Sequence, residues 1–219
     1  MITPSPAGQK PARREPGEAR RLLIDAARAA FAARGYSGTS TREIAEQAGV
    51  SETLIFRHFG SKGRLFDAAV LEPFDDLVGG FVETWQAQLG SPPHARAVIR
   101  HFVEGLYELL RAHRALVLAV VAANAFEREA LDNGQGDSEL SQQLDVVAGI
   151  VEAQVGPGGL GLNVPVTVRA VVAMVMAMAV LDDWLLPQGA DAGVTAARLV
   201  DEMVFQALYG VAGRHLDIL

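Results

Sequence analysis

The sequence predicts an all-α protein. Half of its 219 residues are hydrophobic, and only 3 are Tyr and 2 are Trp, which are residues that sheets favour. Apolar residues recur at helical spacing along most of the chain, and no stretch alternates apolar and polar residues as a half-buried strand does. Loops rich in Gly, Pro and Asn separate the helical stretches; the clearest are DNGQGD, GPGGLGLNVP and PQGAD.

The first two helices are delimited by turn and capping residues. Residues 18–34 carry apolar side chains every three or four positions, and Gly35 follows them as the glycine that commonly ends a helix. Thr39, Ser40 and Thr41 are candidate caps of the next helix. Glu43 lies three residues after Ser40, which is the spacing of a capping box.

Ser51 is placed to cap a third short helix, and Gly60 to end it. Ser61 then caps a long fourth helix, in which Pro73 predicts a kink or a break. Five further helical patterns follow, so that nine helices are expected, three short and six longer. Their predicted ranges are 18–34, 42–48, 52–59, a helix from 62 onward, 94–111, 115–131, 138–155, 166–186 and 192–209.

Charge is unevenly divided along the chain. Residues 1–70 hold 11 Lys+Arg against 7 Asp+Glu, a balance of +4, whereas residues 71–219 hold 8 against 19, a balance of −11. This division suggests a small cationic module on a larger acidic body, as in a nucleic-acid binder with a separate sensing or assembly domain. Considered alone, the division is better explained by a chance fluctuation of surface charge.

Three features of the sequence indicate where in the cell the protein is located. The chain has no cysteine, which excludes disulfides and thiolate metal sites and fits a reducing cytoplasm. Residues 1–16 are rich in Pro and basic residues and lack the apolar core of a signal peptide, so that we expect a disordered basic arm there. The most apolar run, 170–181, is too short to span a bilayer. We therefore expect a cytoplasmic protein with no membrane partner.

Residues 44–55 have the spacing of a helix-turn-helix. Ala45 is small enough to let two helices approach closely, Gly49 suits a turn with positive φ, and Ile55 can fill the angle between the helices. This set of positions, with caps on both helices and a preceding helix, predicts a DNA-binding module.

Helical geometry then separates the residues of the second helix into an inward and an outward face. Ile55 and Phe59 are four residues apart and are expected to face inward. The remaining positions point toward a DNA major groove, where Arg57 can bind guanine or a phosphate and Glu52 can accept from cytosine N4. Lys62, in the first turn of the next helix, is expected to bind a phosphate together with helix amides; an exposed lysine without a role is the alternative.

The segment GTSTREIAEQAGVSETLIFRHFGSKGRLFDAAV resembles the DNA-binding domain of TetR-type (tetracycline-repressor-like) transcriptional regulators. The resemblance covers about 55 residues. It implies phosphate contacts for Thr41, His58 and Lys62, and base or neighbouring phosphate contacts for others. Phe56 departs from the usual tyrosine and lacks the hydroxyl that binds a phosphate. The candidate DNA-contacting residues are Thr41, Arg42, Ser51, Glu52, Thr53, Phe56, Arg57, His58 and Lys62.

The division of domains follows from these observations. Residues 17–72 are expected to form a three-helix DNA-binding domain with its helix-turn-helix at 41–59, and residues 73–219 a six-helix effector-binding and dimerisation domain. In the family the last two helices form a four-helix bundle with those of a partner; the alternative is that their apolar stripes belong to the core of one chain. The candidate homodimer residues are Val172, Met176, Val180, Val200, Met203, Val204 and Ala207.

Aromatic residues in the helices between the DNA-binding domain and the last two helices predict a pocket for a small apolar or aromatic effector. Asn124, within an apolar run, is expected to be a buried polar anchor, although such an amide can instead bond a neighbouring helix. The candidate pocket residues are Phe81, Trp85, Phe102, Tyr107, Asn124 and Phe126.

The sequence therefore predicts a transcriptional regulator, most simply a repressor that a small effector releases from a pseudo-palindromic double-stranded DNA operator. The sequence has no His-Glu-x-x-His, no Gly-x-Ser-x-Gly and no phosphate-binding glycine loop, so we expect neither catalysis nor a metal or cofactor. The alternative is a helical small-molecule-binding protein whose DNA module no longer functions.

Overall fold

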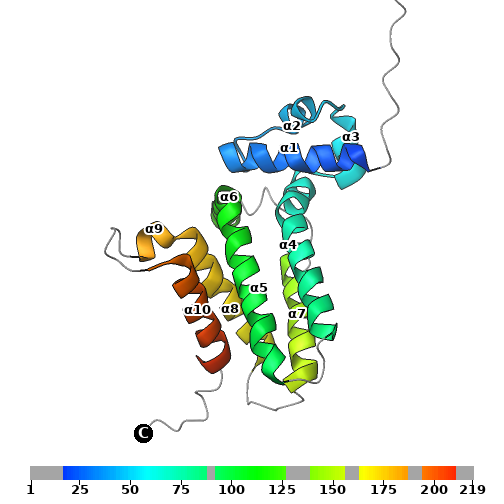
Figure 1. Ribbon diagram of the computed structural model, residues 1–219. Helices are drawn as coiled ribbons and strands as arrows, with labels where there is room; N and C mark the ends of the chain where they lie inside the picture. Colours follow the sequence, from blue (N-terminus) through cyan, green and yellow to red (C-terminus); the bar gives the residue numbers. More distant parts are fainter. Residues whose placement is uncertain (1–16, 88–91, 127–138, 156–162, 187–193, 211–219) are drawn as a thin grey trace, which may run out of the picture.

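The computed structural model describes residues 17–87, 92–126, 139–155, 163–186 and 194–210, and throughout these ranges the regular structure is helical (Figure 1). The all-α prediction is confirmed. The elements are α1 (Glu18–Arg34), α2 (Thr41–Gln47), α3 (Thr53–Phe59), α4 (Lys62–Ala87), α5 (Pro92–Ala112), α6 (Arg114–Phe126), α7 (Glu139–Val155), α8 (Val164–Val180), α9 (Asp182–Leu185), α10 (Ala196–Phe205) and a π-helical turn, η1 (Gln206–Gly210). The basic arm predicted for residues 1–16 lies outside the described residues.

The N-terminal helices form one end of the molecule. Figure 1 shows α1 lying across the ends of α4 and α6, with α2 and α3 on its far side. Below them, α4, α5, α7 and α8 run alongside one another, and α10 flanks α8. The long helix α4 therefore connects the two ends of the molecule.

The end of α1 is fixed by a turn of small and polar residues. Gly35 follows the helix at φ 70°, as predicted, and its N–H donates to Phe31 O. Thr39 is buried, and its hydroxyl approaches Gly35 O at 2.9 Å and Ala30 O at 3.2 Å. The Thr39 hydroxyl can donate its one proton to either carbonyl at the C-terminal end of α1, and it does not cap α2.

Ser40 caps α2 in the predicted capping box. The Glu43 N–H donates to Ser40 Oγ, and the Glu43 carboxylate accepts from the Ser40 N–H at 3.1 Å. The hydrogen bond from the Ser40 N–H, then one from the Ser40 side chain, and to a smaller extent the charge of Arg34, lower the pKa of the Glu43 carboxyl. Gly49 adopts φ 64° between α2 and α3, as the turn requires.

The start of α3 differs from the prediction. The helix begins at Thr53 with Glu52 as its N-cap residue, and no side chain caps it. Glu52 already has helical φ and ψ of −57° and −33°, and the Ser51 carbonyl accepts from the Leu54 N–H at 3.0 Å, so Ser51 does hold the flanking position predicted for the cap. Its side chain makes no capping hydrogen bond within the described residues. Ser61 does cap α4, and its hydroxyl accepts from the Arg64 N–H at 3.1 Å.

Two clusters of buried apolar side chains make up the core. The first joins α1, α2, α3 and the start of α4 to Leu116 and Ala123 of α6. The second joins the rest of α4 to α5, α7, α8 and α10. Along α4 the first cluster ends at Ala69 and the second begins at Phe74, and α4 runs unbroken through Pro73 between them.

The predicted helix 166–186 is wrong as a single element, because α8 ends at Val180 and the short α9 follows it. Leu181 leaves helical geometry at φ −111° and ψ 20°. The next residue, Asp182, turns its carboxylate to Arg111 and Arg114, at 3.1 and 3.2 Å. These two ion pairs hold the Asp182 side chain at the position where α9 begins.

Two other predicted ranges differ at their ends. The predicted helix 192–209 begins later, at Ala196, after Thr195 accepts a hydrogen bond from the Arg198 N–H. The predicted helix 115–131 is described only as far as Phe126.

In the described ranges, no single helix is both long enough and apolar enough to cross a bilayer. The bent pair Arg96–Ala112 and Arg114–Phe126 passes that test by length and composition only, and its two helices meet at 82°.

Candidate DNA-binding surface

Helix α3 is held by two side chains and presents the others to solvent. Ile55 and Phe59 are buried in the first core, as predicted from their spacing. Thr53, Phe56, Arg57 and His58 are exposed, and Phe56 leaves 51% of its surface accessible to water. A short helix with an aromatic, a guanidinium and an imidazole on its outer face has the chemical groups that bind DNA bases and phosphates.

Thr41 and Glu52 are joined to each other. The Thr41 hydroxyl donates to Glu52 Oε1 at 2.6 Å, a length typical of a hydroxyl bound to a carboxylate. Thr41 opens α2 and Glu52 precedes α3, so this hydrogen bond links the two helices of the motif. Both side chains are partly buried.

Arg42 is exposed beside this pair and forms an ion pair with Glu46 at 3.0 Å. The hydrogen bond and charge of Glu46, with a smaller effect of Glu52, raise the pKa of the Arg42 guanidinium. Because both side chains are largely exposed to water, the ion pair contributes little to stability. A DNA phosphate can compete with Glu46 for this guanidinium.

Lys62 has a defined place in the fold, so the alternative of a lysine without a role is wrong. Its ammonium donates to Tyr36 O at 2.6 Å and lies 4.1 Å from the centre of the Tyr36 ring. Tyr36 is buried among Phe31 and Phe66. The lysine thereby ties the first turn of α4 to the loop after α1.

Three of the residues predicted to form an effector pocket share the second core, and two others lie apart from it on α6. Phe81 and Phe102 are buried in the second core with ring centres 4.7 Å apart. Tyr107 is also buried there, and its hydroxyl accepts from Arg111 at 3.0 Å. Trp85 lies in α4, with its side chain outside the described part of the structure.

The prediction that Asn124 and Phe126 line the effector pocket is wrong. Asn124 is exposed, and its amide donates to Val120 O of the same helix at 3.0 Å, so it is not a buried anchor. Phe126 is 87% exposed at the end of α6. Helix α6 buries the opposite face, with Leu116 and Ala123, against α1.

The predicted dimer residues require a similar correction. Val180, Val200, Met203 and Val204 are at most 4% exposed in the second core of this chain, so they cannot contact a partner. Val172, Met176 and Ala207 are partly buried. The exposed large apolar side chains of α8, α9, α10 and η1 are Val166, Trp184, Leu185, Phe205 and Tyr209.

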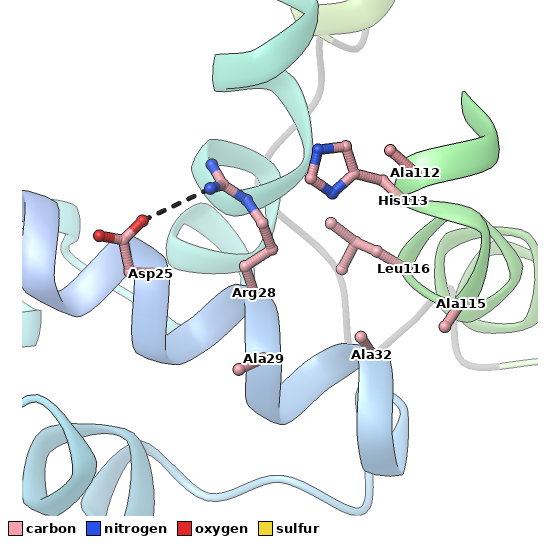
Figure 2. A pocket seen from close by; sticks show the side chains of 8 residues that line it. All are labelled: Asp25, Arg28, Ala29, Ala32, Ala112, His113, Ala115 and Leu116. Atoms are coloured by element: carbon pink, nitrogen blue, oxygen red, sulfur yellow. Dashed lines mark hydrogen bonds and ion pairs between the residues drawn. The ribbon is translucent and has the colours of Figure 1, made fainter. Parts of the chain in front are cut away.

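A cavity that the sequence did not reveal lies between α1 and the junction of α5 with α6 (Figure 2). Arg28 and His113 face each other across it, among alanine side chains and Leu116. Arg28 also donates to Ala69 O and pairs with Asp25 and Glu72. Burial, and then the Arg28 charge, lower the pKa of the His113 imidazole.

The other side of the same junction binds α9. Arg111 and Arg114 share the Asp182 carboxylate, and Arg114 also pairs with Asp183 at 2.8 Å. The sequence showed only two aspartates after an apolar run, because their partners lie about 70 residues away. Residues 111–114 thus contact both α1 and α9.

Comparison with known proteins agrees with this description. Residues 23–69 match the family described as "Bacterial regulatory proteins, tetR family". The HTH-type transcriptional repressor KstR2 of Rhodococcus jostii is 30% identical over 145 residues, which cover 66% of this chain and 69% of KstR2. The HTH-type transcriptional activator FasR of Mycolicibacterium smegmatis is 33% identical over 98 residues, and this chain spans 45% of its length.

The fold is also similar to solved structures. A TetR-like transcriptional regulator from Rhodococcus sp. RHA1 superposes with a TM-score of 0.59 at 21% identity, over 92% of this chain and all of the other. Since a family profile spans the helix-turn-helix and the similarity to KstR2 covers two thirds of both chains, this protein belongs to the tetR family of bacterial regulatory proteins.

Proposed function

We propose that this protein is a cytoplasmic transcriptional regulator that binds double-stranded DNA through α3. The observation that carries the proposal is the division of α3, in which two residues anchor the helix and Thr53, Phe56, Arg57 and His58 face solvent. Thr41, Arg42, Glu52 and Lys62 border this surface. Ser51 is exposed next to it and is retained as a candidate contact.

In a homodimer, α3 of the partner supplies a second helix that contacts DNA bases. One helix-turn-helix contacts about half a turn of DNA, and a pseudo-palindromic operator places two half-sites about 34–36 Å apart. We place the dimer contact on the exposed apolar residues of α8 to η1, chiefly Trp184, Leu185, Phe205 and Tyr209. The buried stripe predicted from the sequence is not part of this contact.

We propose further that a small apolar or aromatic effector releases the DNA, so that the protein acts as a repressor. The Phe81–Phe102 pair between α4 and α5 is the candidate effector position. An effector that separated these rings would tilt α4, which carries Lys62 at its other end. Such an effector changes DNA binding only by its difference in affinity for the two states.

Selection of operators from random duplex DNA by the full chain tests the proposal. Arg57→Ala should lower affinity for the selected operator about 10- to 100-fold and relax the preference at one base pair. Arg96→Ala, which removes an exposed arginine of α5, is the matched control and should leave affinity unchanged. Equal affinities of wild type and Arg57→Ala would exclude α3 as the reading helix.

A helical small-molecule-binding protein with an inactive DNA module is the second candidate, and Phe56 is the observation that favours it. Phe56 is exposed in the reading helix without the hydroxyl that could bind a phosphate. A gel shift with DNA from the gene's own promoter separates the two, since an inactive module gives no specific band.

A further inference from the structure

Thr41 and Glu52 were each expected to contact DNA, yet in the structure each satisfies the other. A threonine hydroxyl has one proton to donate, and a phosphate oxygen can only accept. The Thr41 proton is directed to Glu52 Oε1 at 2.6 Å. Thr41 therefore cannot donate to a phosphate while this hydrogen bond lasts.

Glu52 has the opposite requirement. A carboxylate on the DNA-facing side is repelled by phosphates and gains a favourable contact only where a base presents a donor, such as cytosine N4 in the major groove. Once a base donates to Glu52, the carboxylate has another partner and holds Thr41 less strongly. Both residues are only partly buried, so the side chains have room to change partners.

We infer that Thr41 and Glu52 act as one specificity-determining pair, in which Glu52 withholds the Thr41 proton from the DNA backbone until a base pair supplies another donor. This inference rests on the proposed DNA-binding function. A duplex with cytosine in the correct position gains both the base contact and the phosphate contact. Any other duplex gains neither without breaking the Thr41–Glu52 hydrogen bond, so the pair lowers non-cognate binding.

A double-mutant cycle on random-sequence duplex DNA tests the inference with the full-length protein. Glu52→Gln leaves only a weaker, neutral acceptor for Thr41, so non-cognate affinity should rise about tenfold. In a Thr41→Val background the same change alters charge alone, and the rise should be several-fold smaller. In a Thr41→Ser background, which keeps the hydroxyl, the full rise should return.

Glu46→Gln is the control for charge. Glu46 is an exposed carboxylate of α2 that pairs with Arg42. Its removal should raise non-cognate affinity by the same factor in the wild-type background and in the Thr41→Val background. If Glu52→Gln also gives one factor in both backgrounds, the two residues act independently and the inference is overturned.

Urea unfolding of the free protein separates this outcome from failure of the proposed function. The midpoint should fall in Thr41→Val and in Glu52→Gln, and fall little further in the double variant, because both changes remove one hydrogen bond. Additive losses would overturn the pair even in the absence of DNA. If the losses are non-additive but wild type binds no DNA at any salt concentration, the proposed function and the withholding role both fail.

Discussion

At the scale of single residues, α3 buries Ile55 and Phe59 in the first core and exposes its other face to solvent, whereas apolar residues surround most of α6. Ile55 and Phe59 were predicted to be inward and are buried. Asn124 was predicted wrongly because α6 is apolar around most of its circumference, and Leu118 and Val121 are exposed on it as well. Composition alone could not tell which face of such a helix meets α1.

Lys62→Ala tests two roles of one side chain. Loss of a phosphate contact should reduce the slope of log affinity against log salt by about 0.9. Loss of the hydrogen bond to Tyr36 O should also lower the free energy of unfolding by roughly 1 kcal/mol. Operator binding across salt concentrations and urea unfolding measure the two effects. An unchanged slope with reduced stability would assign Lys62 to the fold alone.

His113→Gln should make stability less dependent on pH. The pKa of His113 is lowered from the ordinary value of about 6.5, so the unfolded chain takes up the proton more readily. Wild type therefore loses stability as the pH falls through 6.5 and toward the folded pKa, whereas above about pH 7.5 the residue contributes nothing to the pH dependence. Urea unfolding at pH 8 and pH 5 should show a smaller loss in His113→Gln.

The control for this prediction is His101→Gln, which replaces an exposed histidine of α5. It should leave the loss of stability between pH 8 and pH 5 as large as in wild type. If His113→Gln loses as much stability as wild type between pH 8 and pH 5, the contact with α1 does not disfavour protonation of the imidazole.

At the scale of elements, local signals predicted most helix boundaries. The capping box at Ser40, the glycine after α1 and the Ser61 cap depend on residues within a few positions of each other. The end of α8 does not. The residue that follows the break, Asp182, pairs with Arg111 and Arg114, which the sequence places far from it. Local sequence patterns cannot predict a helix end at which the side chains pair with residues far away in the sequence.

Gly38→Ala should destabilise the loop between α1 and α2. A Cβ added at Gly38 would lie 2.3 Å from Arg34 O, and this backbone atom cannot move without disturbing the end of α1. We expect a loss of about 1–3 kcal/mol in the free energy of unfolding. Gly79→Ala is the control, because a Cβ there meets nothing within 4 Å inside α4 and should stabilise by about 0.5–1 kcal/mol. Urea unfolding of both variants measures the difference.

At the scale of the whole molecule, the sequence predicted two regions but not which helix faces meet. The apolar stripes of α8 and α10 were predicted to contact a partner, with the core of one chain as the alternative, and their most buried residues do form the second core. Similarly, α6 follows α5 in sequence but contributes Leu116 and Ala123 to the first core. Pairing of faces depends on how helices are arranged in space, which periodicity does not specify.

Trp184→Glu and Phe205→Glu should convert a homodimer to monomer, because each places a charge on the proposed dimer surface at a side chain that is at least 50% exposed. Light scattering after gel filtration measures the mass. Val121→Glu, at an exposed position of α6, is the control and should remain dimeric. Variants that keep the dimer mass would place the contact elsewhere.

The junction of α5 with α6 restricts insertions and deletions of residues at this point of the chain. Within four consecutive residues, Arg111 and Arg114 bind Asp182 while His113 faces α1. An α-helix turns by about 100° per residue. One residue inserted or deleted here would rotate α6 by that amount and turn Leu116 and Ala123 away from α1. Substitutions at this junction can be compensated by neighbouring side chains, whereas a change of length cannot, so insertions and deletions should be tolerated far less here than in the loops.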